Sequence, residues 1–100
     1  MKTVLFLNEG YLGDITKHTR LQAVIFSMQN GGISGIENEC LYNKDINYLT
    51  LWCLSKDVKE IYTQNIHPED KKIFQKLGIS IKTTSDVEND AFFKSFIFKE

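Results

Sequence analysis

The sequence predicts a single α/β domain, spanning residues 1–100, that is built on a mixed β-sheet. A length of 100 residues is typical of one domain. The second half of the chain alternates strand-like apolar runs with amphipathic helical patterns, which indicates βαβ units. The first half carries an Asn-Gly pair between two strand-like runs, which predicts a hairpin. The predicted order of elements is β-β-β-α-β-α-β-α.

The first half of the chain predicts three strands. The continuous apolar run Thr3–Leu7 is typical of a strand buried on both faces. Ala23–Met28 and Ile33–Leu41 flank the Asn30–Gly31 turn and predict the hairpin. The polar segment Asn8–Arg20 carries two glycines and predicts a long loop, and long ordered loops are often functional.

The second half predicts helices with recognisable ends. Asp45 is a suitable N-cap for the first helix, whose apolar positions include Leu49 and Cys53. A strand follows at Val58–Thr63. Pro68 suits the first turn of the next helix, and Gly78 is placed to end it.

The last two elements complete the pattern. Ile79 and Ile81 alternate as in a strand, and Ser85 with Glu88 forms a capping box ahead of a last helix. Right-handed crossovers place the last two strands parallel to the first, which gives a five-stranded sheet with the hairpin at one side. The residues predicted to be buried are Leu5, Val24, Phe26, Ile61, Ile73, Phe74, Leu77, Ile81 and Phe96.

Charge and hydropathy exclude several classes of partner. The formal net charge is −1, the lysines are scattered, and Arg20 is the only arginine, so we expect no nucleic-acid partner. No apolar run approaches the length of a membrane span. Cys40 and Cys53 belong to no CxxC pair and no metal spacing, which is typical of a reduced cytoplasmic protein with free thiols.

Two segments resemble the dinitrogenase iron–molybdenum cofactor biosynthesis family. His18-Thr19-Arg20-Leu21-Gln22-Ala23 is similar to the family's histidine motif, although the Phe and Gly of that motif are missing. The sequence FQKLGISI matches the family's entry into a late strand, whereas QNIHPED lacks the family's glycine-rich turn. The resemblance covers nearly the whole chain. It implies a three-layer ribonuclease-H-like fold and an accessory protein that binds iron–sulfur or iron–molybdenum cofactor precursors, with no demonstrated enzymatic activity.

The candidate site residues come from this resemblance and from residue chemistry. They are His18 as a metal ligand, and His18, Arg20, His67 and Cys40 as cofactor-binding residues. Each has a structural alternative: an exposed loop histidine for His18, a capping or exposed histidine for His67, and a structural residue for Cys40. Cys53, on the apolar side of a helix, fits a core residue. The expected site is the sheet edge that carries the loop Asn8–Arg20 and the turn Asn65–Asp70.

Two functional hypotheses follow. One is a small non-enzymatic domain that binds a cofactor precursor, and the other is a cofactor-free protein-interaction or regulatory domain. A nuclease is excluded because Thr3–Leu7 contains no acid to hold metal ions. We expect the purified protein to be colourless and free of metal in air. The aromatic last helix, with Phe93, Ile97 and Phe98, predicts a homodimer or a protein partner.

Overall fold

The computed structural model describes residues 2–9, 11–15, 20–42 and 45–87. Within these ranges no helix is long and apolar enough to cross a membrane. The elements are β1 (Lys2–Asn8), β2 (Tyr11–Leu12), β3 (Arg20–Gln29), β4 (Gly32–Tyr42), α1 (Ile46–Ser55), β5 (Val58–Tyr62), α2 (Pro68–Lys76), β6 (Ser80–Lys82) and α3 (Thr84–Val87).

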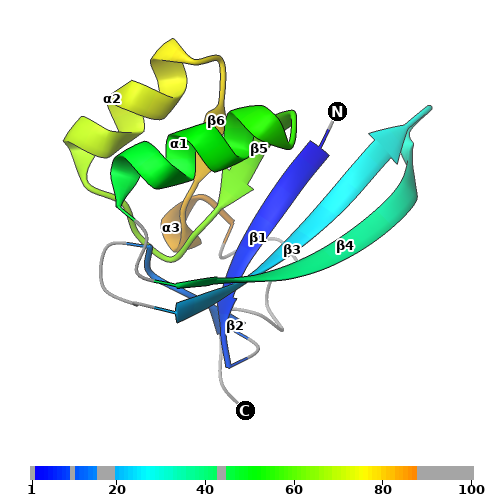
Figure 1. The fold of residues 1–100 in the computed structure, drawn as a ribbon, viewed down its shortest axis with the longest axis horizontal. Coiled ribbons are helices and arrows are strands. Elements are labelled where there is room, and N and C mark those ends of the chain that lie inside the picture. Colours follow the sequence, from blue (N-terminus) through cyan, green and yellow to red (C-terminus); the bar gives the residue numbers. More distant parts are fainter. Residues whose placement is uncertain (1, 10, 16–19, 43–44, 88–100) are drawn as a thin grey trace.

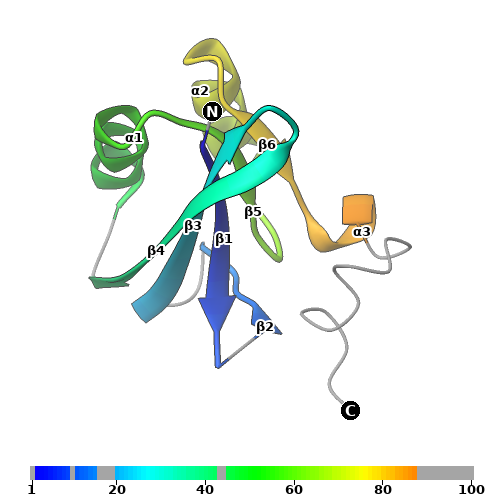
Figure 2. The same ribbon diagram turned by 90° about the vertical axis from the view of Figure 1, so that its right-hand side faces the viewer.

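The strands form one mixed sheet in the order β4-β3-β1-β5-β6, and the short β2 pairs with β1 (Figure 1). β1 pairs antiparallel with β3 and parallel with β5, and β5 pairs parallel with β6. Figure 2 shows α1 on one side of the sheet and α3 on the other. The prediction of an α/β domain with a mixed sheet and a hairpin at one side is therefore confirmed.

The hairpin of β3 and β4 forms because its turn residues accept left-handed backbone angles. Asn30 has a φ of 54° and Gly31 a φ of 78°, and Gln29 pairs with Gly32 to close a two-residue loop. Positive φ at both central residues is the geometry that matches the twist of the two strands. Both strands run further than the sequence predicts, because ladder pairing continues down to Arg20 opposite Tyr42.

The segment after β1 is more regular than the predicted long loop. β2 turns straight back onto β1, pairing Leu12 with Leu7 and Tyr11 with Asn8. Glu9, in the intervening turn, has a φ of 53°. Leu12 and Ile15 are buried, so apolar residues in a mainly polar segment hold the chain against the sheet.

The larger core lies between the sheet and the helices α1 and α2. Leu49, Trp52 and Cys53 of α1 and Phe74 of α2 pack against the apolar residues of the strands. The predicted caps are confirmed: Asp45 accepts a hydrogen bond from the Tyr48 amide, and the helix α2 is followed by Gly78 with a φ of 79°.

The prediction that Ile73 and Leu77 are largely buried is wrong. Ile73 is 40% and Leu77 38% exposed, while Phe74 between them is fully buried. The helix α2 is short and contacts the sheet along a narrow line, so only the residue on that line is covered. The flanking positions of the apolar stripe remain accessible to solvent.

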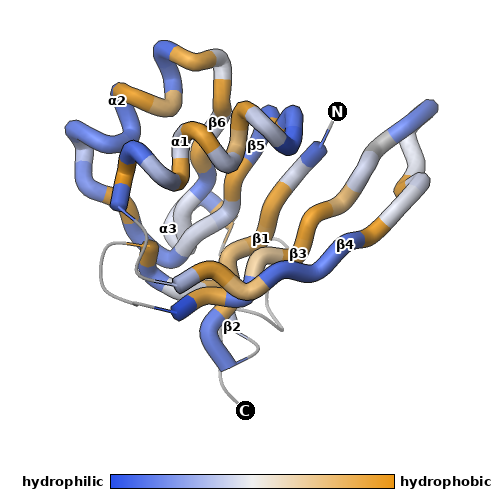
Figure 3. The backbone as a smooth tube through the Cα atoms, in the orientation of Figure 1, coloured by the Kyte–Doolittle hydropathy of each residue, from blue (hydrophilic) through white to orange (hydrophobic). Residues whose placement is uncertain are grey.

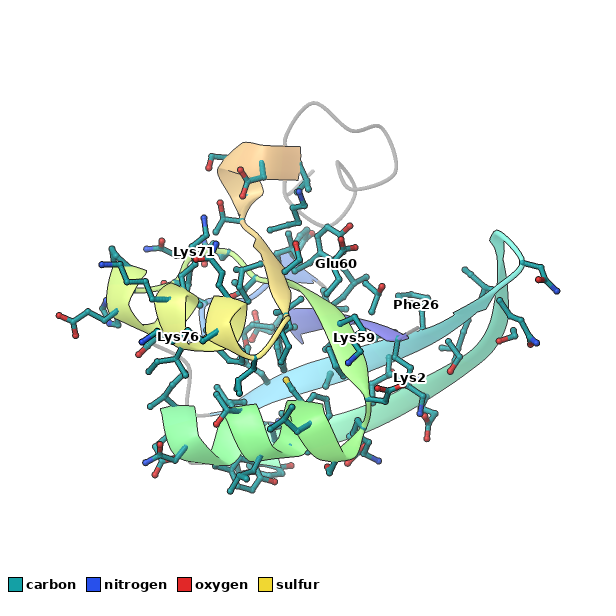
Figure 4. The ribbon with its side chains drawn as sticks, turned by 90° about the horizontal axis from the view of Figure 1, so that it is seen from above. Lys2, Phe26, Lys59, Glu60, Lys71 and Lys76 are labelled. Atoms are coloured by element: carbon teal, nitrogen blue, oxygen red, sulfur yellow. The ribbon has the colours of Figure 1, made fainter. Side chains whose placement is uncertain are left out.

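A smaller cluster lies on the opposite face of the sheet. It joins Leu5, Leu7, Leu12 and Val87, with Val24, Phe26 and Tyr62 half-buried against it. Figure 4 shows Phe26 and Glu60 on the side of the sheet away from α1. Leu5, Ile61 and Ile81 are buried as predicted, whereas Val24 and Phe26 are only half-buried.

The cap of α3 differs from the predicted one. The Asp86 carboxylate accepts hydrogen bonds from the Thr83 amide and the Thr83 hydroxyl, so Thr83 caps this helix and Ser85 lies inside it. Hydrogen bonding to Thr83 lowers the pKa of Asp86. The predictions on Phe96 and on the aromatic last helix lie outside the described residues.

Candidate functional site: a pocket at the end of β1

The carboxyl ends of β1 and β5 meet at one edge of the sheet, as the sequence predicts for parallel strands. The Gly13 carbonyl accepts hydrogen bonds from the Gln64 amide at 2.8 Å and from the Thr63 hydroxyl at 2.9 Å. The same hydroxyl accepts a bond from the Ile15 amide at 3.4 Å. The two segments expected to flank a site are therefore joined directly, with the fully buried Thr63 between them.

The two histidines do not form a described site. His67 is exposed and occupies the N-cap position of α2, but its side chain makes no capping hydrogen bond. Glu69 and Asp70 follow in the first helical turn, where carboxylates complement the helix dipole. His67 fits the structural alternative of an exposed residue before Pro68. His18 lies outside the described residues.

A pocket forms at the carboxyl end of β1, on the side of β1 that pairs with β3 and continues to β4. Its volume is about 420 Å³, within the range usual for small-molecule sites. The lining residues are Leu7, Asn8, Glu9, Arg20, Gln22 and Cys40. Leu7 is in register with Gln22, and Gln22 with Cys40, so one row of side chains across three strands forms its floor. We call this space the β1-exit pocket.

Arg20 is held at the pocket by two residues of β4. Its guanidinium carbon lies 5.8 Å from the centroid of the Tyr42 ring, within the range of a cation–π contact. A hydrogen bond to Cys40 and the neighbouring Tyr42 raise the pKa of Arg20. Arg20 faces Tyr42 in the ladder, and Cys40 is its diagonal neighbour on the same face. The strand pairing therefore positions a permanently charged donor group at the pocket.

The remaining polar lining is fixed by local structure. The Gln22 amide nitrogen donates to the Asn38 side-chain oxygen at 3.0 Å, which orients both amides on this face. Glu9 projects from the β1–β2 turn and is exposed. The Arg20 guanidinium contacts Cys40 and Tyr42 of β4. The lining thus offers one positive group on β3 and one negative group in the β1–β2 turn.

The two cysteines have opposite environments. Cys40 is exposed and lines the pocket, whereas Cys53 is buried in the core between the sheet and α1. Burial raises the pKa of the Cys53 thiol to about 12. Cys53 therefore behaves as a small apolar core residue, as predicted, and Cys40 is the thiol available to a ligand.

The described residues do not fit an iron–sulfur cluster. Such clusters are held by a full set of Cys thiolates, and the pocket lining supplies one sulfur, that of Cys40. Among residues 2–9, 11–15, 20–42 and 45–87, no group of three His, Cys, Asp or Glu side chains is arranged to hold a metal ion. The donor set is instead one of hydrogen bonds and charges.

Sequence reasoning identified Arg20 and Cys40, and the structure brings these two together. It did not name Leu7 or Gln22, and it included Asn8 and Glu9 only as part of the loop Asn8–Arg20. Alternation along β1 and β3 would have placed Leu7 and Gln22 on one face, but their pairing depends on a register that the sequence does not specify. Glu9 was assigned to a long loop, so its place in a tight turn was not foreseen.

Comparison with known proteins gives the fold and no more. No protein-family model and no curated protein sequence matches this chain. The chain is similar to the crystal structure of the protein PH0822, with a TM-score of 0.70 and 14% sequence identity. The match covers 100% of this chain and 95% of that one. At this level of identity the likeness supports a shared α/β fold over the whole length.

Proposed function

We propose that this chain is a small non-enzymatic accessory domain that binds a small molecule in the β1-exit pocket. The observation that carries the proposal is the convergence of Arg20 and Cys40 in a pocket of about 420 Å³. Both were selected from the sequence as cofactor-binding residues, and they lie on neighbouring strands with a contact between them. A concave site with a few fixed polar groups is the usual form of a ligand site.

The strand order supports a ribonuclease-H-like topology within this proposal. The strands β1, β3 and β4 pair antiparallel with one another in that order. The strands β5 and β6 follow on the other side of β1 and run parallel to it. That arrangement is the one expected from the resemblance to dinitrogenase cofactor accessory proteins. Because the described lining offers hydrogen bonds, two charged groups and one thiol, the ligand that we propose for this pocket is an organic molecule. A cytoplasmic location belongs to the same proposal, because an exposed free thiol such as Cys40 persists in reducing surroundings.

The test uses a defined library of metabolite-sized compounds, grouped as monoanions, monocations, zwitterions and neutral molecules. Two-dimensional NMR of the isotope-labelled chain reads the backbone amides of Gln22 and Cys40. We expect at least one group to shift these amides, and Arg20→Ala to remove the shift. Lys59→Ala is the matched control, because Lys59 is a surface cation near the start of β5, beside the start of β1 and away from the pocket at the end of β1. If none of the groups shifts the pocket amides, the proposal fails.

A second candidate, a cofactor-free protein-interaction domain, is favoured by the helix α1. Its ten residues, INYLTLWCLS, include no charged side chain, although one side of the helix faces solvent. Tyr48, Leu51 and Leu54 are exposed on that side, and Figure 3 shows hydrophobic segments alternating with paler ones along α1. A helix that is apolar beyond its buried stripe commonly meets a second surface. This function is tested by self-association and by its loss in Leu51→Glu.

A further inference from the structure

The β1-exit pocket contains one fixed cation and one anion, and this pairing limits which ligands it can accept. Arg20 comes from the start of β3 and Glu9 from the turn after β1. A monoanion would meet the guanidinium but also the like charge of Glu9. A monocation would meet Glu9 but also the charge of Arg20. Each singly charged ligand therefore leaves one pocket charge uncompensated.

We propose that the pocket binds a small zwitterion of the amino-acid or short-peptide type, with its carboxylate against Arg20 and its ammonium group against Glu9. The inference rests on the proposed function, since it names the ligand class of the same site. The guanidinium offers a planar set of donors that suits a carboxylate. A carboxylate such as Glu9 accepts hydrogen bonds from an ammonium group, which has three donors.

The rest of the lining fits the uncharged parts of such a molecule. Leu7 supplies an apolar wall for a side chain. Asn8 and Gln22 carry amides that can donate to and accept from a peptide or amide group. Gln22 keeps its orientation through the 3.0 Å bond to Asn38. A volume of about 420 Å³ has room for an amino acid with a large side chain or for a dipeptide.

The contacts of Arg20 with β4 favour the carboxylate end of the ligand at this position. Its guanidinium is placed by the Tyr42 ring and the Cys40 sulfur before any ligand arrives. A group that is ordered in advance loses less conformational entropy on binding. Tyr42 and Cys40 do not compete for the charge as a carboxylate would, so the guanidinium remains available to the ligand.

The experiment compares matched ligands on the intact chain. The probes are free amino acids and dipeptides, together with their N-acetylated and C-amidated forms, which each keep one charge. Calorimetry at low salt measures affinity, and NMR locates the site at the Gln22 and Cys40 amides. We expect either blocked form to bind about tenfold more weakly or worse than the free zwitterion.

Two substitutions test which pocket residue contacts each end of the ligand. Arg20→Gln should erase the discrimination against the C-amidated form, and Glu9→Gln should erase the discrimination against the N-acetylated form. Both residues are exposed, so these variants are expected to fold, and circular dichroism checks this. Asp57→Asn, a change of an exposed acid in the turn before β5, beside the start of β1 and away from the pocket, should leave every affinity unchanged.

The outcomes separate this inference from the proposed function. Equal affinity of free and N-acetylated ligands for the pocket would overturn the inference that the ligand is a zwitterion. It would leave the proposal of a small-molecule site standing. Shifts at the pocket amides with monoanions or neutral compounds, but not with zwitterions, would do the same. No shift at these amides with any of the compound groups overturns both.

The alkylation rate of Cys40 gives an independent readout. The Cys40 thiol lines the pocket, so a bound zwitterion should slow its reaction with iodoacetamide. The buried Cys53 serves as an internal reference in the same chain. Protection of Cys40 by a blocked ligand equal to that by the free zwitterion would count against the inference.

Discussion

Cys40 and Cys53 have the same side chain but lie in different surroundings, one exposed and one buried. Cys40 lies at the pocket in contact with the Arg20 guanidinium, whereas Cys53 lies in the core with a thiol pKa of about 12. Reaction with alkylating agents proceeds through the thiolate and needs access to the sulfur. The raised pKa and the burial of Cys53 both slow its reaction, so Cys40 is the thiol that reagents can reach.

The raised pKa of Cys53 predicts a loss of stability in alkali. The unfolded thiol releases its proton near its ordinary value of 9.0, while the folded thiol keeps its proton until about 12. Between these values the unfolded state binds fewer protons, so rising pH favours unfolding, by up to about 1.4 kcal/mol per pH unit. Below pH 9 the contribution of Cys53 to the pH dependence should vanish.

Urea unfolding at several pH values between 8 and 10.5 measures this effect. Other groups titrate in the same range, so the comparison is with Cys53→Ala, which removes the thiol. The variant should be less stable throughout, because it leaves a cavity, but its stability should fall less steeply with pH. Parallel curves for the two proteins would show that Cys53 titrates normally in the folded chain.

At the scale of the elements, the edge of the sheet at the site depends on Gly13. This residue is hydrogen-bonded both to β1 and to the segment after β5. Its amide donates to the Phe6 carbonyl at 2.8 Å, and its carbonyl accepts from Gln64 and Thr63. A Cβ at this position would overlap the Leu21 side chain and would lie 3.1 Å from the Asn8 backbone nitrogen. Leu21 is buried, so it cannot move freely aside.

Gly13→Ala should therefore destabilise the fold by about 1–3 kcal/mol, the usual cost of overpacking a core. Gly32→Ala is the matched control, since its nearest neighbour is the Gln29 carbonyl at 3.9 Å and its surroundings are exposed. Urea denaturation of both variants gives the two free energies of unfolding. An equal, small loss in both would show that the β1–β2 turn shifts easily to accept the methyl group.

Local signals predicted most of the elements, and long-range pairing decided what they missed. Asn30–Gly31, Asp45 and Gly78 carry their conformational preference in their own chemistry, and all three act as predicted. β2 has only two residues and exists because β1 is available as a partner, which no local pattern reveals. Ile73 and Leu77 stay exposed for a similar reason, since the width of a helix contact depends on the sheet below it.

The candidate site was predictable in part for the same reasons. Arg20 and Cys40 stood out by residue chemistry, and β3 and β4 bring them together. His67 lies at the exposed N-cap of α2, which is its structural alternative, and it does not line the pocket. The pocket depends on how β1, β3 and β4 are paired in register. Its two charged groups come from different elements, Glu9 from a turn and Arg20 from a strand. The expectation of an iron-containing cargo came from resemblance, and the described donor groups do not support it.

At the scale of the whole molecule, the outer face of α1 is the clearest unpartnered apolar surface among the described residues. Leu51 is 67% exposed, and Tyr48 and Leu54 lie three residues to either side of it. The helix carries no charge that would oppose the approach of another apolar surface. The predicted dimer through Phe93, Ile97 and Phe98 concerns residues outside the described ranges and stays a separate prediction.

We expect the outer face of α1 to pack on the same face of a second copy. An antiparallel copy related by a two-fold axis at Leu51 would place Leu51 against itself and Tyr48 against Leu54. A surface that is complementary to itself in this way suits a symmetric dimer. The helix dipoles would also be antiparallel, which is favourable. Three side chains per copy make a small interface, so the dimer should be weak and should form only at high concentration.

Sedimentation equilibrium over a range of protein concentrations tests this expectation. Leu51→Glu should leave the monomer folded, because residue 51 is exposed, and should abolish dimerisation by placing two like charges on the axis. Ile36→Glu is the control, since Ile36 is 59% exposed but lies on β4. A wild-type chain that stays monomeric up to about 1 mM, the weakest affinity expected of a specific contact, would contradict the dimer. A dimer that Leu51→Glu leaves intact would move the interface away from α1.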